Sequence, residues 1–161
     1  MVLRARDVMQ SQVATVEPGM SLIQLDELLA REKVSGMPVV EGGAVVGVVS
    51  RTDIVRGLGD AEGAAEATQA YYHDVAGAEL DHAAAARRSG ERIATMTVRE
   101  VMSSEIVAVS PEDSIREVAR TLVRGRMHRL LVMEGRRLAG IVTTFDLVHA
   151  IADGRLGASA G

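Results

Sequence analysis

The sequence predicts an α/β fold, α+β-like in character, with two tandem β-α-β-β-α repeats packed about a pseudo-two-fold axis. Three observations predict it. Residues 6–55 align with residues 99–148 without a gap, and 16 of the 50 positions are identical. Both copies end on one pattern, GVVSRTD at 47–53 and GIVTTFD at 140–146. The expected strands are apolar almost throughout, which is typical of a sheet covered by helices. Two copies are too few for a solenoid, so a packed pair is the simpler architecture.

The first half of each copy predicts an extended piece and a helix. Residues 13–19 read VATVEPG, and the proline and glycine mark the turn that ends the extended piece. Ser21 is a good N-cap, and leucines follow it at helical spacing. In the second copy Ser114 takes the place of Ser21, and apolar residues recur behind it in the same way. A helix is therefore expected to begin after each serine.

The second half of each copy predicts a hairpin and a second helix. Strands are expected at 37–40 and 44–49 in the first copy and at 130–133 and 138–142 in the second. Glycine-containing turns separate the strands of each pair. A helix then opens at Ser50 or at Thr143.

The resulting organisation has four parts. We expect a first repeat at 1–56, a second repeat at 99–152 and a flexible tail at 153–161. The segment between the repeats, 57–98, is rich in alanine and acidic residues, and we expect it to be a partly helical linker.

Composition excludes several classes of function. The net charge is -4 and no basic stripe stands out, which argues against a nucleic acid polymer as partner. Without cysteine there is neither a disulfide framework nor thiolate chemistry, and this fits a reducing cytosol. No window approaches the ~18 consecutive apolar residues that suggest a membrane span. We therefore expect a cytoplasmic protein that does not associate with membranes.

The repeated S/T-x-x-D ending has two interpretations. Ser50 with Asp53, and Thr143 with Asp146, fit a capping box at a helix start. Alternatively, each aspartate lies where a strand ends and a helix begins, which is where α/β sheets place ligands. There it would accept hydrogen bonds from the two hydroxyls of a ribose, while the helix N-terminus faces a phosphate. Gly47 and Gly140 favour the second interpretation, because glycine within a strand often marks a close approach.

These features together resemble the CBS-domain pair, the tandem module named after cystathionine β-synthase. The resemblance rests on the order of elements, the two endings and the segments VSGMPVV at 34–40 and MHRLLVM at 127–133. It covers about residues 6–56 and 99–150. It implies a stand-alone regulatory module, not an enzyme, that binds AMP, ADP, ATP or S-adenosylmethionine and so senses energy state. No cofactor is required, although Mg²⁺ can accompany a nucleotide.

The resemblance also implies the residues of two clefts between the repeats. In each, the aspartate binds ribose, the main chain near Ala14 or Val107 reads adenine, and a basic pair suits phosphate. The implied set for cleft one is Val48, Ser50, Asp53, Val107, Met127, His128 and Arg129. The implied set for cleft two is Ile141, Thr143, Asp146, Met9, Gln12, Ala14, Val34 and Ser35. Because the first copy has Ser35-Gly36 where the second has the basic pair His128-Arg129, the clefts should be unequal.

Partners follow from the same resemblance. It implies a homodimer and an unknown effector protein that reads the ligand-induced change. Apolar residues on the copy helices, Leu25, Leu29, Val118 and Leu122, are expected to supply the dimer interface. We expect no metal site, since His73-Asp74 and Asp81-His82 do not place two histidines on one helical face.

The alternative function is a structural dimerisation or interaction domain without ligand, in which the S/T-x-x-D motifs are only helix caps. Turnover of the nucleotide is a weaker alternative. No set of residues nominates a catalytic base or nucleophile.

Overall fold

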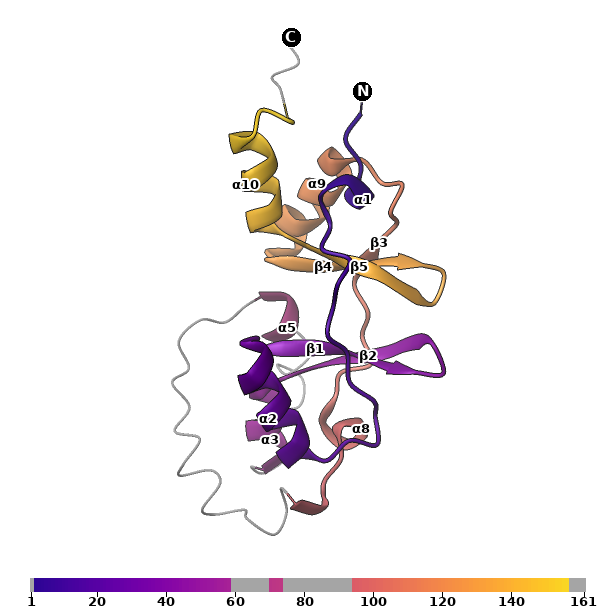
Figure 1. Ribbon diagram of the computed structural model, residues 1–161, viewed down its shortest axis with the longest axis vertical. Helices are drawn as coiled ribbons and strands as arrows, with labels where there is room; N and C mark the ends of the chain where they lie inside the picture. Colours follow the sequence, from indigo (N-terminus) through magenta and orange to yellow (C-terminus); the bar gives the residue numbers. More distant parts are fainter. Residues whose placement is uncertain (1, 59–69, 74–93, 157–161) are drawn as a thin grey trace. The chain divides into compact units, whose positions relative to one another are not determined.

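The computed structural model describes residues 2–58, 70–73 and 94–156 (Figure 1). The chain divides into two compact units. Unit 1 comprises residues 1–13 and 107–161, and unit 2 comprises residues 14–106. Each unit therefore combines most of one repeat with the segment that precedes the other repeat.

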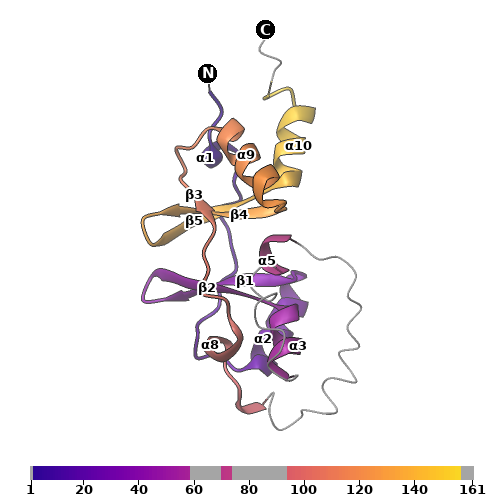
Figure 2. The same cartoon turned by 180° about the vertical axis from the view of Figure 1, so that it is seen from behind.

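Unit 2 is built on an antiparallel hairpin. Its strands are β1 (Gly36–Glu41) and β2 (Ala44–Ser50), and Val16 adds a parallel bridge to Val39. Its helices are α2 (Leu22–Glu32), α3 (Arg51–Leu58), α5 (Ala70–His73) and α8 (Val98–Val101). Helices α2 and α3 lie on one face of the hairpin, and α5 lies on the opposite face (Figures 1 and 2).

Unit 1 repeats this plan with a third strand. β3 (Ala108–Val109) pairs in parallel with β4 (Arg129–Glu134), which pairs antiparallel with β5 (Arg137–Thr143). The helices are α1 (Ala5–Val8), α9 (Ile115–Gly125) and α10 (Thr144–Ala152). The predicted order of elements is confirmed in both repeats. The first strand of repeat 1 is the exception, because its pairing is reduced to the Val16 bridge.

The long helices begin where the sequence predicts. The hydroxyls of Ser21 and Ser114 accept hydrogen bonds from the main-chain N–H groups of Gln24 and Glu117, three residues later. Both helices end on a residue in the left-handed conformation, Lys33 (φ 55°) and Arg126 (φ 51°). Glycine is usual at such an end, so these two positions carry local backbone strain.

Two short helices, α1 and α8, were not predicted, and they hold the leading segments in place. In unit 1 the N–H of Ala5 donates to the carbonyl of Asp113 (2.8 Å), and that of Ile115 donates to Leu3 (2.9 Å). In unit 2 the N–H of Val98 donates to Met20 (2.9 Å), and that of Leu22 donates to Met96 (3.1 Å). The same repeat positions make these bonds. Each leading segment thus packs on the helix start of the repeat that it does not precede.

Gly140 and Gly47 make room for these segments. A Cβ atom added to Gly140 would lie 2.6 Å from the carbonyl oxygen of Gln10, and one added to Gly47 would overlap the carbonyl of Ser103. Gln10 and Ile141 exchange both main-chain hydrogen bonds, and so do Ser103 and Val48. The close approach predicted from the glycines exists, but the chain's own backbone makes it rather than a ligand.

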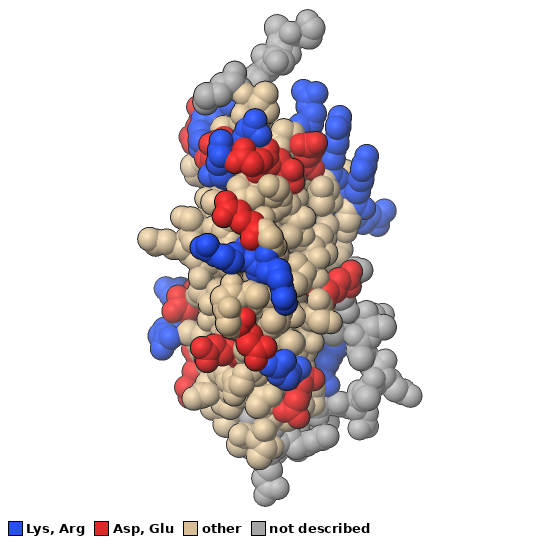
Figure 3. Space-filling model, turned by 90° about the vertical axis from the view of Figure 1, so that its right-hand side faces the viewer, with Lys and Arg blue, Asp and Glu red and all other residues tan. Residues whose placement is uncertain are grey.

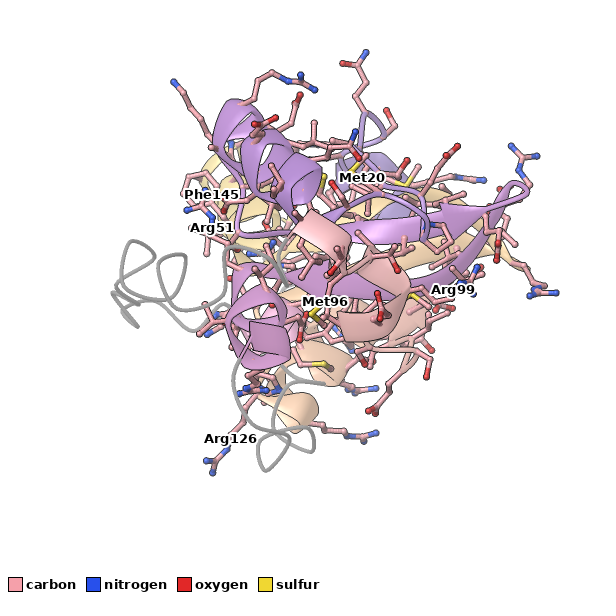
Figure 4. The ribbon with its side chains drawn as sticks, turned by 90° about the horizontal axis from the view of Figure 1, so that it is seen from below. Met20, Arg51, Met96, Arg99, Arg126 and Phe145 are labelled. Atoms are coloured by element: carbon pink, nitrogen blue, oxygen red, sulfur yellow. The ribbon has the colours of Figure 1, made fainter. Side chains whose placement is uncertain are left out.

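Each unit has its own apolar core, and the cores contain the helix residues expected at a dimer interface. Leu25, Leu29 and Val118 are completely buried, and Leu122 is 2% exposed. They pack against the strands of their own unit. Met96 adds to the core of unit 2 beside α3 and α8 (Figure 4). The predicted interface was therefore wrong, because apolar residues at helical spacing cover the sheet before they cover a partner.

Two residues of the predicted tail make contacts with unit 1. The guanidinium of Arg155 donates to the carbonyl of Asp7 (2.7 Å), and Leu156 packs against the core of unit 1. Residues 157–161 lie outside the described residues, as do 59–69 and 74–93 of the predicted linker. Within 57–98 the described residues include α5 and the start of α8, so the linker is helical in part.

We predict that Gly140→Ala lowers the free energy of unfolding by about 1–3 kcal/mol, because the added methyl group must displace the backbone of Gln10. Thermal unfolding followed by circular dichroism measures the loss. Gly19→Ala is the matched control: its Cβ would meet nothing within 4 Å, so its stability should not fall. Equal melting temperatures for the two variants would contradict the proposed close approach.

Candidate functional site

The candidate site of unit 1 lies where β5 ends and α10 begins. The main-chain N–H of Thr143 donates to Oδ2 of Asp146 (2.7 Å), and the hydroxyl of Thr143 donates to the same oxygen (2.8 Å). The N–H of Asp146 donates back to that hydroxyl oxygen (3.2 Å). The predicted capping box is therefore formed. It also fixes the carboxylate of Asp146, which is partly exposed.

Gln10 completes this arrangement. Its amide Nε2 donates to Oδ1 of Asp146 at 3.1 Å, across the backbone pairing of Gln10 with Ile141. The sequence prediction included Met9 and Gln12 on either side but missed Gln10. The internal alignment held a signal for Gln10. It pairs Gln10 with Ser103, directly after the identical residues Met9 and Met102, and Met9 was already a predicted site residue.

The matching site of unit 2 has the same local geometry in a different environment. The N–H and hydroxyl of Ser50 donate to Oδ2 of Asp53, at 2.7 Å and 3.1 Å. Asp53 is only 2% exposed, and its Oδ1 is buried without a hydrogen-bond donor among the residues that the structure describes. Ser103 takes the place of Gln10 here, and its hydroxyl accepts from the N–H of Glu105 (3.3 Å).

Burial changes the acidity of Asp53. Loss of hydration raises its pKa to about 6, against the opposing effects of the Ser50 hydrogen bonds and the charge of Arg56. A carboxylate with one unpaired buried oxygen is costly, so protonation of Asp53 relieves part of that cost.

The first amide groups of the two helices are already used. The N–H of Arg51 donates to the carbonyl of Ser35 (3.0 Å), and that of Thr144 donates to the carbonyl of His128 (2.9 Å). The sequence interpretation assigned such helix N-terminal groups to a phosphate. For these two groups that is wrong, because the loop before each hairpin takes them.

The structure places the predicted site residues in both units. Unit 1 brings Met9 and Ile141 beside Gln10, and His128 beside Thr144. Unit 2 brings Ser35 beside Arg51. The other predicted site residues divide between the two units. Unit 1 contains Gln12, Val107, Met127 and Arg129, and unit 2 contains Ala14, Val34 and Val48. Each implied cleft takes residues from both units, so the composition of the clefts stays a prediction.

Exposure also differs among these residues. Gln12, Ala14, Val34, Ser35 and His128 are exposed, whereas Val48 is 1% exposed. The exposed residues have side chains that a ligand can reach without rearrangement, whereas Val48 offers a ligand little surface.

Two negative findings concern the described residues alone. Among residues 2–58, 70–73 and 94–156, no helix has the length and apolar character needed to cross a membrane. In the same part of the chain, no group of three or more metal-ligating side chains converges. Asp74, Asp81 and His82 lie outside the described residues.

We predict that Asp53 makes stability depend on pH. Because its pKa is raised to about 6 in the folded chain, the folded state keeps a proton that the unfolded state releases near pH 4. The free energy of unfolding should therefore fall as pH rises from about 4 to 6, by on the order of 2–3 kcal/mol, and then level off. Asp53→Asn should remove this decrease in urea titrations across that range.

The matched control is Glu27→Gln, which neutralises an exposed carboxylate on α2. It should leave the fall in stability in place. An Asp53→Asn variant with the pH profile of the unchanged chain would contradict the raised pKa.

The profile of the CBS domain family matches this chain twice, at residues 5–60 and 98–153. The CBS domain-containing protein YhcV of Bacillus subtilis is 27% identical over 142 residues, which cover 88% of this chain and 81% of YhcV. Enzymes also contain such a region. The A-adding tRNA nucleotidyltransferase of Geobacter sulfurreducens is 26% identical over 95% of this chain, but the match covers only 14% of the enzyme.

Solved structures share the fold. A CBS domain-containing protein of unknown function from Bacillus anthracis superposes with a TM-score of 0.70 at 21% identity, covering 94% of each chain. CBSX2 in complex with AMP gives 0.67 at 24% identity, covering 95% of this chain and 98% of CBSX2. The CBS domain pair of protein MJ0100, in complex with 5′-methylthioadenosine and S-adenosylmethionine, gives 0.63 at 17% identity, covering 95% and 98%. With both repeats matched by the family profile, this chain belongs to the CBS domain family.

Proposed function

We propose that this chain is a regulatory module of the cytosol that binds an adenosine-containing ligand and signals its presence to a partner protein. The ligand is AMP, ADP, ATP or S-adenosylmethionine. Membership of the CBS domain family supports the proposal. So do the two structural neighbours, which were crystallised with AMP and with S-adenosylmethionine. A response to AMP or ATP would make the module a sensor of cellular energy.

The observation that carries the proposal is the carboxylate of Asp146. It lies at the end of β5, is partly exposed and is held from two sides by Thr143 and Gln10. A carboxylate fixed in this way can accept hydrogen bonds from two neighbouring ribose hydroxyls without losing further rotational freedom. Such preorganisation improves affinity because less entropy is lost on binding.

The other residues proposed for ligand binding are the remaining members of the two implied sets. In the set that contains Asp146, main-chain groups near Ala14 read the adenine. In the set that contains Ser50 and Asp53, the main chain near Val107 would read the adenine and the basic pair His128-Arg129 would contact phosphate. A basic pair suits an anion, since charge-assisted hydrogen bonds are stronger than neutral ones. The net charge of -4 argues against a nucleic acid polymer as partner, and the face drawn in Figure 3 carries acidic as well as basic side chains.

The structural alternative also has an observation in its favour. Thr143 and Asp146 form both hydrogen bonds of a capping box, and Asp53 accepts the return bond from the N–H of Ser50, so neither aspartate needs a ligand to explain its position. The two functions differ in what Asp146→Asn removes. A cap loses a little stability, whereas a ribose site loses its ligand.

The proposal includes no catalytic step. The sequence nominates no catalytic base and no nucleophile for turnover of a nucleotide. Long incubation with ATP, followed by chromatography for ADP, AMP or phosphate, tests this part.

We also propose that the chain forms a homodimer through α10. Phe145, Val148 and Ile151 recur every three residues and are 69%, 59% and 60% exposed. An apolar stripe of this kind on a helix is typical of a surface that a partner covers.

We predict that an adenosine ligand at about 100 times its Kd stabilises the chain by about 2.7 kcal/mol, which raises the melting temperature by several degrees. Calorimetry with AMP, ADP, ATP and S-adenosylmethionine, each with and without Mg²⁺, measures the shift. GTP is the control ligand. Asp146→Asn should lose the shift while costing only about 0.3–1 kcal/mol of stability, the usual contribution of a charge at a helix N-terminus.

The opposite result is equally clear. If no adenosine ligand shifts the melting temperature at millimolar concentration, the sensor function is wrong, and the chain is a structural pairing domain with two capped helices.

We predict that the double variant Val148→Asp, Ile151→Asp is monomeric, because two charges would be buried without partners at the dimer interface. Sedimentation equilibrium measures the mass. Val123→Asp is the matched control, since Val123 is 77% exposed on α9 and its substitution should leave the dimer intact. A monomeric unchanged chain would refute the proposed dimer.

A further inference from the structure

The short helix α5 brings two tyrosines from the segment between the repeats into the interior. Tyr71 and Tyr72 are each only 2% exposed, and their rings meet edge to face with centroids 5.2 Å apart. They are the only tyrosines of the chain. Helix α5 contacts β2 on the face of the hairpin that α2 and α3 leave uncovered (Figures 1 and 2).

Tyr71 lies over the end of the hairpin at which the candidate site of repeat 1 is found. Gly36 pairs with Ser50 across the two strands. A Cβ atom added to Gly36 would lie 2.7 Å from Cδ2 of Tyr71 and 3.3 Å from Cα of Ser50. The ring of Tyr71 therefore fills the space beside Ser50 that a side chain at position 36 would take.

The other repeat has no such space to fill. Its residue in the position of Gly36 is Arg129, which carries a long basic side chain. The missing basic residue of repeat 1 is thus not a simple loss of charge. Glycine at this position is what allows the aromatic ring to approach the strand.

Tyr72 anchors the helix at its other side. Its hydroxyl donates to the carbonyl oxygen of Glu105 (3.2 Å), in the leading segment that packs on repeat 1. Since Ser103 of the same segment pairs with Val48, α5 is tied to the backbone that borders the Ser50–Asp53 site. The two tyrosines therefore hold α5 at both the strand end and the leading segment.

The exposure of the two aspartates fits this arrangement. Asp53 is 2% exposed, whereas its counterpart Asp146 is partly exposed. A ribose needs direct access to the carboxylate oxygens, and only Asp146 provides it.

We propose that α5 occupies the ligand position of repeat 1, so that the chain binds a single adenosine ligand, at Thr143 and Asp146. This inference rests on the proposed function and adds its stoichiometry. Because α5 is part of the same chain, a ligand for repeat 1 competes with a group whose effective concentration is on the order of millimolar. Because α5 must leave before a ligand enters, the apparent affinity of a ligand for repeat 1 falls in proportion to the fraction of chains in which that position is open.

Tyrosine nitration tests the position of α5 without any substitution. The chain has no cysteine, so tetranitromethane reports on Tyr71 and Tyr72 alone, with nitration followed by intact mass. We expect both tyrosines to be protected in the native chain, with or without saturating AMP, and to react in denaturant. Fast nitration of the native chain, or nitration that AMP accelerates, would overturn the proposal.

Isothermal titration with AMP tests the stoichiometry. The unchanged chain should bind one AMP and Tyr71→Ala should bind two, because removal of the ring opens the space beside Ser50. Tyr72→Phe is the matched control: it loses one hydrogen bond, keeps the ring, and should bind one. In the Tyr71→Ala background, adding Asp53→Asn should return the number to one.

The possible failures are distinct. Two AMP molecules on the unchanged chain, or one on a folded Tyr71→Ala variant, would overturn the role of α5 and leave the sensor function standing. No binding of AMP, ADP, ATP or S-adenosylmethionine to any variant would overturn both. If Tyr71→Ala does not fold, as judged by circular dichroism, the stoichiometry of the unchanged chain and the nitration experiment still decide.

Discussion

The fold depends on the backbone pairing of each leading segment with the last strand of the repeat that it does not precede. Gln10 pairs with Ile141 and Ser103 pairs with Val48, and each pairing passes over a glycine in the strand. The partners are more than 50 residues apart in sequence, so forming them closes a long loop and has an entropic cost. Each unit is incomplete without a piece of chain from beside the other repeat, so neither repeat contains all of its own core.

This exchange also sets the chemistry of the two candidate sites. The residue that crosses the glycine stands next to the aspartate at the helix start. In unit 1 it is Gln10, long enough to donate to Asp146. In unit 2 it is Ser103, whose hydroxyl is bonded to the nearby N–H of Glu105 instead. A single difference in side-chain length thus separates an aspartate with both oxygens bonded from one with a buried oxygen that lacks a donor among the described residues.

Repeat 1 differs from repeat 2 in two linked ways: it has glycine at position 36, and helix α5 packs on its hairpin. Gly36 and the tyrosines of α5 belong to different parts of the chain, yet each explains the other: the glycine leaves a space and Tyr71 fills it. The two repeats therefore keep one backbone plan while offering a ligand different surfaces.

The sequence by itself determined the elements of this protein. Serine caps, helical spacing, glycine turns and the internal repeat predicted α2, α9, both hairpins and the helices after Ser50 and Thr143, because these signals act over a few residues. The family was recognisable for the same reason. Only the tertiary structure decided which leading segment packs on which repeat, that Leu25 and Val118 are core residues, and that Gln10 and Tyr71 approach the two candidate sites. Those contacts join residues far apart in the sequence, where burial and long-range hydrogen bonds, rather than local pattern, determine the neighbours.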